Sequence, residues 1–128
     1  MMPDEKAQLL ALLERESSWC RDAEARDSDG RAVHFDDNTA VAWDITGALC
    51  RLFGWQRACE LFRQLERHIL GKPKAAGWPV PDPSIGAMKS LQEFNDHADT
   101  TLEMIREAIE KVPAWHGQRP ADVSAAGA

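Results

Sequence analysis

Glycine and proline divide this chain into short segments, and their positions constrain its fold more than any other feature. The segments repeat apolar side chains with the period of a helix, and they cover about residues 3–17, 39–53, 55–70, 83–95 and 101–112. Gly54 and Gly71 each follow such a segment, at the position where a left-handed residue ends a helix. Residues 72–83 are rich in proline and must form an extended connection. The sequence therefore predicts an all-α fold of about five helices in a compact bundle.

Residues 20–37 lack the helical period. They contain the turn dipeptide Asp29-Gly30, and small and apolar residues alternate after it, which favours a short β-hairpin between the first and second helices. Three side chains that commonly cap helices then precede the second helix: Asp36, Asp37 and Asn38.

The length of 128 residues is typical of a single domain. We expect this domain over residues 1–112, followed by a flexible tail over 113–128. The 21 acidic and 15 basic side chains give a net charge of −6, and no basic stripe is present, which argues against nucleic acid. No apolar run approaches the roughly 20 residues of a membrane span, and the N-terminus does not have the pattern of a signal peptide. Three cysteines without metal or disulfide spacing indicate a reduced, cytoplasmic setting.

Asp44 lies within the segment predicted as the second helix. Apolar residues cover more than half of that helix, and the remaining strip holds Ala40, Asp44, Gly47 and Arg51. In one interpretation this strip faces solvent. In the other, the small residues at 40 and 47 allow a ligand or another backbone to approach, and Asp44 lies at the floor of a groove.

Asn95 falls on the apolar side of the fourth helix, where an unpaired amide would cost about 1–3 kcal/mol. We expect it to end the helix as a left-handed cap, or to bond the turn over 96–100. The alternative is a pocket wall that Asp44 also lines. The candidate pocket then comprises Trp19, Trp43, Asp44, Gly47, Asn95 and Asp96.

Recognised chemical motifs are missing from the sequence. The four histidines show no metal-binding spacing, and no nucleophile, base and oxyanion hole assemble along the chain, so neither a metal nor a cofactor is expected. Trp78 lies on the proline-stiffened connection, where it either folds back on the core or anchors a partner.

Several short motifs occur in an order that resembles a known family. They are Trp19-Cys20, Asp29-Gly30, Ala40-Val41-Ala42-Trp43, Gly47-Ala48 and Phe94-Asn95-Asp96. Together they resemble a family of small bacterial and phage helical proteins, a domain of unknown function. The resemblance implies a helical protein and no established activity.

The sequence therefore favours a small non-catalytic protein-binding or adaptor module, with a protein partner or a second copy of itself. The alternative is a small hydrolase or metal-dependent enzyme whose pocket is lined by Asp44, Asn95 and Asp96. A homodimer that buries the strip from Ala40 to Gly47 is a third hypothesis.

Overall fold

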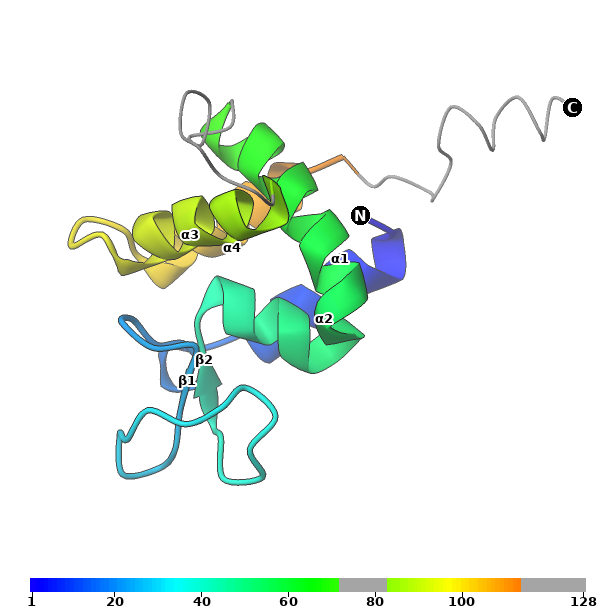
Figure 1. Cartoon of the computed structure of the whole chain (residues 1–128). Coiled ribbons are helices and arrows are strands. Elements are labelled where there is room, and N and C mark those ends of the chain that lie inside the picture. The colour runs from blue at the N-terminus through cyan, green and yellow to red at the C-terminus, as the bar shows by residue number, and fades with distance from the viewer. Residues whose placement is uncertain (72–82, 114–128) are drawn as a thin grey trace, which may run out of the picture.

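The computed structural model describes residues 1–71 and 83–113. In chain order its elements are α1 (Pro3–Leu12), a 3-10 turn (Glu16–Ser18), β1 (Ala25–Arg26), β2 (Ala42–Trp43), α2 (Ile45–Leu65), a π-helical turn (Glu66–Leu70), α3 (Pro83–Asp96) and α4 (Leu102–Lys111). The fold is mainly helical, as predicted, with a short antiparallel strand pair between the first two helices (Figure 1). Trp78 and residues 114–128 of the predicted tail lie outside the described residues.

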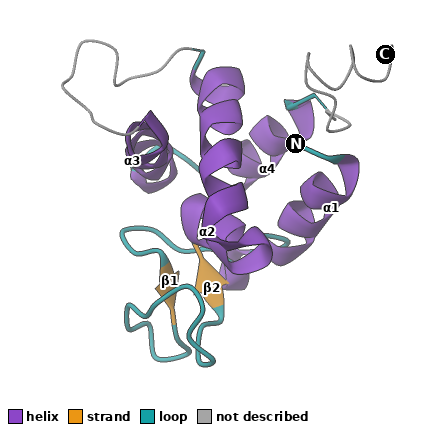
Figure 2. Cartoon of the chain, turned by 45° about the vertical axis from the view of Figure 1, so that its right-hand side comes forward, coloured by secondary structure: helices purple, strands orange, loops and turns teal. Residues whose placement is uncertain are grey.

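The central element is α2, which lies between α3 on one side and α1 and α4 on the other (Figure 2). Gly54 interrupts it with a left-handed φ of 80° and a ψ of 165°. The sequence divides the chain into two helices at this glycine, and the backbone does leave the helical conformation there, so α2 consists of two helical parts joined at a kink. Four α-helices are therefore described where about five were expected.

Two predicted helix boundaries were wrong. The first helix ends at Leu12 and not at about residue 17. The second begins at Ile45 and not at residue 39, because Ala42 and Trp43 pair with a strand. Asp44 is the cap of α2, so the capping role predicted for residues 36–38 was also wrong. Asp37 instead accepts hydrogen bonds from the amide and hydroxyl of Thr39, at 2.8 and 2.6 Å.

The strand pair is extended by single bridges on both sides. Ala25 pairs with Trp43 and Arg26 with Ala42 in antiparallel register. Trp19 bridges Trp43 in the parallel sense, and Arg26 bridges Ala32 around the Asp29-Gly30 turn. The chain between residues 19 and 43 therefore folds back on itself at the start of α2.

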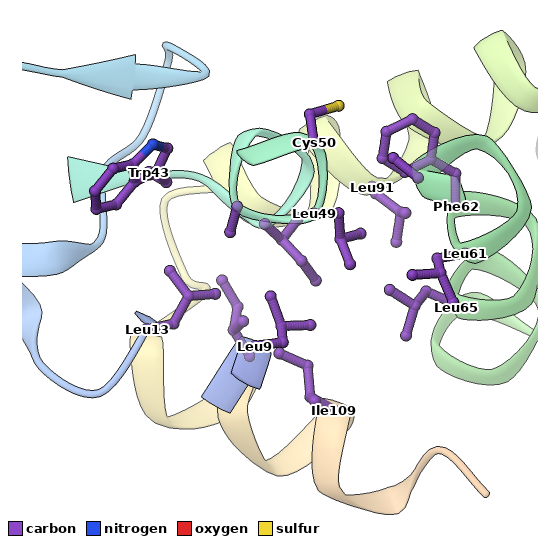
Figure 3. Close-up of a cluster of buried hydrophobic side chains, with 14 of the residues drawn as sticks. Leu9, Leu13, Trp43, Leu49, Cys50, Leu61, Phe62, Leu65, Leu91 and Ile109 are labelled. Atoms are coloured by element: carbon purple, nitrogen blue, oxygen red, sulfur yellow. The ribbon is translucent and has the colours of Figure 1, made fainter. Parts of the chain in front are cut away.

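One apolar core joins all four helices. Leu49, Leu61, Phe62 and Leu65 of α2 meet Leu91 of α3 (Figure 3). Leu9 and Leu13 from the α1 end and Ile109 of α4 close the other side. Val41 and Trp55 are apolar residues of the segments predicted as helices over 39–53 and 55–70, yet they are 47% and 46% exposed. Among residues 1–71 and 83–113, no helix is long and apolar enough to cross a membrane.

α1 and α4 cap each other's C-terminal ends. The Lys6 ammonium donates hydrogen bonds to the carbonyls of Glu110 and Val112. The Arg106 guanidinium donates to the carbonyls of Leu10 and Leu13, at 2.5 and 2.9 Å. The last turn of α1 contains no basic residue, so α4 supplies the positive charge that this helix end favours.

We expect Arg106→Met to lower the free energy of unfolding by about 1.5–3 kcal/mol, because two carbonyls lose a charged donor while the apolar stem is retained. Urea denaturation measures this loss. Arg63→Met removes an exposed arginine from α2 and should change stability by less than about 0.5 kcal/mol. Equal losses in the two variants would contradict the capping role.

Candidate functional site

Asp44 is buried at the junction between β2 and α2. Its side chain is 2% exposed, so the interpretation of a solvent-facing strip was wrong. Its Oδ1 accepts hydrogen bonds from the Gly47 amide at 2.6 Å and from the Thr46 hydroxyl at 2.9 Å. Its own amide donates to the carbonyl of Glu24 at 3.2 Å. The carboxylate therefore caps α2 beneath the segment that leads into β1.

Gly47 is the point of closest approach between that segment and α2. A Cβ at this position would lie 1.9 Å from the Glu24 carbonyl oxygen and 2.8 Å from its carbonyl carbon. The glycine thus accommodates a neighbouring backbone, which is one of the two roles that the sequence suggested for a small residue there.

Asn95 is fully buried, and its amide group makes four hydrogen bonds. Oδ1 accepts from the Trp19 indole at 2.8 Å and from the Ile45 amide at 3.1 Å. Nδ2 donates to the Cys20 carbonyl at 3.0 Å and to Asp96 Oδ1 at 2.9 Å. Asn95 therefore joins α3 to the start of α2 and to the segment after α1. The expected left-handed cap at Asn95 was wrong, because α3 continues to Asp96 and Asn95 has no positive φ. Of the residues 96–100 that it was expected to bond, Asn95 bonds Asp96.

Asp96 is half-buried beside this amide. Its Oδ1 also accepts a hydrogen bond from the Asp22 amide at 2.9 Å. Asp22 has a φ of +62°, a left-handed conformation that non-glycine residues rarely adopt. Asp96 therefore holds the 20–24 segment in a strained turn.

The two tryptophans of the candidate pocket have different surroundings. The Trp19 indole enters the cluster through Asn95. Trp43 contributes its carbonyl, which accepts from the Cys20 amide, while its indole donates to the Phe35 carbonyl at 3.0 Å. The structure thus brings together five of the six candidate residues through their side chains or close packing, whereas Trp43 joins through its backbone.

Among the described residues, the groups that donate hydrogen bonds to the Asp44 carboxylate carry no positive charge. Burial raises the pKa of Asp44 to about 7, and the nearby carboxylates of Asp96 and Glu24 add to this effect. Burial, reinforced by Asp44, also raises the pKa of the Cys20 thiol to about 12. A thiol with so high a pKa does not supply a thiolate nucleophile near neutral pH.

Sequence reasoning missed two members of the cluster. The Glu24 carbonyl accepts a hydrogen bond from the Asp44 amide, and the Glu24 carboxylate accepts one from the Phe35 amide at 2.9 Å. Thr46 links Asp44 to Gln92 of α3, whose amide lies 3.4 Å from the hydroxyl. The spacing of Asp44 and Gly47 is that of a cap and the third helical residue, and this signal could have located the helix start.

An open groove lies at a different place, between the end of α1 and α4. It has a volume of about 470 Å³ and is lined by Glu14, Arg15, Glu16, Leu102, Glu103, Arg106, Glu107 and Glu110. None of the predicted pocket residues lines it. Their role in ligand binding stays a prediction. The described parts of the chain contain no group of three His, Cys, Asp or Glu side chains that could hold a metal ion.

The fold and the cluster define a small, mainly helical domain with a buried polar junction. The chain belongs to a family of unknown function, DUF6197, whose model matches residues 7–114. This confirms the resemblance to a domain of unknown function. No curated protein and no solved structure matches the chain.

Proposed function

We propose that this chain is a non-catalytic binding module, and that the groove between α1 and α4 receives a positively charged segment of a partner protein. The observation that carries this proposal is the groove itself, a concave surface whose lining includes five glutamates and two arginines. Its volume falls in the range of natural ligand pockets, roughly 300–1,000 Å³.

The groove offers a partner mainly negative charge. Leu102 is the apolar residue of its lining, and at 4% exposed it adds little apolar contact. Arg106 is engaged with the carbonyls of α1, so its charge partly serves the helix end. The glutamates of α4 occupy an exposed face of the helix. This arrangement would attract lysine or arginine side chains.

The buried cluster supports the non-catalytic part of the proposal. Asp44 Oδ1 and both polar atoms of the Asn95 amide make hydrogen bonds that join α2, α3 and the 20–24 segment. A general acid or base must reach the proton that it transfers. Side chains that are 2% and 0% exposed and internally bonded do not meet that requirement in this conformation.

The test is the binding of two labelled peptides of equal length, one rich in lysine and one rich in glutamate, measured by fluorescence anisotropy. We expect only the lysine-rich peptide to bind, and Glu103→Lys/Glu110→Lys to weaken it about tenfold or more. Asp29→Lys/Asp36→Lys makes the same change in net charge at exposed sites outside the groove and is the matched control.

The control variant should weaken binding only by the long-range effect of charge, which salt screens over about 10 Å at 0.1 M. Equal losses in the two double variants would show that net charge, and not the groove, attracts the peptide. Failure of the wild-type chain to bind the lysine-rich peptide would rule out a basic segment as the occupant.

A further inference from the structure

Asp44 occupies an unusual position for a carboxylate. It is 2% exposed, yet both donors to its Oδ1, the Gly47 amide and the Thr46 hydroxyl, are neutral. No salt bridge involves it among the described residues. A buried carboxylate without a cationic partner is costly to ionise.

The titratable groups that surround Asp44 add no compensating charge. Glu24 approaches from the segment before β1 and Asp96 from α3, and both raise the pKa of Asp44. The thiols of Cys20 and Cys50 also interact with it, from the segment after α1 and from α2 itself. Arg26 lowers the pKa of the Cys20 thiol, but it donates its own hydrogen bonds to the carbonyls of Gly30 and Arg21.

The segment that covers Asp44 is held by hydrogen bonds to several elements. The Cys20 amide donates to the Trp43 carbonyl, and the Cys20 carbonyl accepts from Asn95. The Arg21 guanidinium donates to the Thr100 carbonyl, and the Glu24 carboxylate accepts from the Phe35 amide. The strained Asp22 is fixed through its amide to Asp96, and the Glu24 carbonyl rests on Gly47 and on the Asp44 amide. Asp22 itself is exposed. Water can reach an ionised Asp44 once this segment lifts, and lifting also relieves the left-handed strain at Asp22.

We propose that residues 20–24 form a proton-sensitive latch over the start of α2, which is held closed most firmly while Asp44 carries a proton and opens more often once Asp44 ionises. The latch controls the packing of Trp19 and Cys20 against Asn95. None of its residues lines the groove between α1 and α4.

The sign of the effect follows from the proton affinity of the two states. Burial raises the pKa of Asp44 to about 7 in the closed state, whereas a carboxyl in water keeps the ordinary value of 3.8. The closed state therefore binds the proton more tightly. Opening becomes easier as the pH rises between these two values, by up to about tenfold per pH unit, and levels off above the higher one.

Amide hydrogen exchange resolved by NMR tests the latch. The protection factors of the Gly47 and Ile45 amides should fall by up to about tenfold per unit between pH 5 and 7 and level off above it. Low concentrations of urea should not accelerate this exchange, because a local opening exposes little surface. The Ile109 amide in the core should respond to urea and serves as the reference for global unfolding.

Two variants separate Asp44 from other titrating groups. Asp44→Asn keeps a capping oxygen without the charge, and it should remove the pH dependence of the Gly47 amide. Asp44→Ser caps in the same way and replaces it if the asparagine variant does not fold. Asp37→Asn is the matched control, since Asp37 accepts the same pair of bonds from Thr39 at a site where hydrogen bonding lowers its pKa.

The control should keep the wild-type pH profile. The proposal is overturned if the profile survives in both Asp44 variants, if protection is constant across the pH range, or if Gly47 and Ile109 accelerate together in urea. The last result would mean that only global unfolding exposes Asp44.

Discussion

Asn95→Ala should lower the free energy of unfolding by about 4 kcal/mol, the largest loss that we expect from a single side chain. The substitution leaves the Trp19 indole, the Ile45 amide and the Cys20 carbonyl without their partner in a site that is fully buried. Each unpaired buried group costs about 1–3 kcal/mol, and the small cavity adds to this. In a domain of this size the melting temperature should fall by more than about 10 °C.

The measurement is thermal and urea denaturation of the variant beside Asn38→Ala. Asn38 is an exposed loop asparagine, and its replacement should change stability by less than about 0.5 kcal/mol. A loss below about 1 kcal/mol for Asn95→Ala would contradict the structural role of the amide. It would also reopen Asn95 as a residue retained for ligand binding.

Gly47→Ala should destabilise the fold by about 2–3 kcal/mol or more, although alanine is the better helix former by about 1 kcal/mol. The new methyl group would meet the Glu24 carbonyl at 1.9 Å, and backbone on both sides must move to relieve the overlap. Overpacking of this kind typically costs 1–3 kcal/mol. Steric repulsion therefore outweighs helix propensity at this position.

Gly30→Ala separates steric overlap from backbone strain. Nothing lies within 4 Å of a Cβ at Gly30, but its φ of +81° is unfavourable for alanine. That variant should lose about 1–2 kcal/mol, from conformation alone. If Gly47→Ala were as stable as the wild type or more so, the close packing of Glu24 on α2 would be wrong.

The helical class and most core positions could be predicted from local pattern. Leu9, Leu49, Phe62, Leu91 and Ile109 lie on apolar faces of periodic segments, and all are buried in the core. The apolar face of a helix depends only on the spacing of apolar residues within that segment, so it can be predicted directly from the sequence. The break at Gly54 was also predictable from local sequence, because glycine readily adopts the positive φ that interrupts a helix.

The start of α2 could not be predicted in this way. Val41 continues the apolar period of Ile45 and Ala48, which extended the expected helix backwards to residue 39. Residues 42 and 43 instead pair with residues 25 and 26, and a local pattern contains no information on so distant a partner. The pairing turned Val41 to solvent and placed Asp44 at the helix cap.

The sequence by itself determined a small helical domain, its main core residues and the set of polar side chains worth testing. It also showed that Asn95 and Asp44 place an amide and a carboxylate among apolar neighbours. Only the tertiary structure decided that α3 carries the amide to the start of α2 and that Glu24 closes over Gly47. The physical reason is that hydrogen bonds between distant segments depend on how helices pack, whereas apolar periodicity depends only on the residues of each helix.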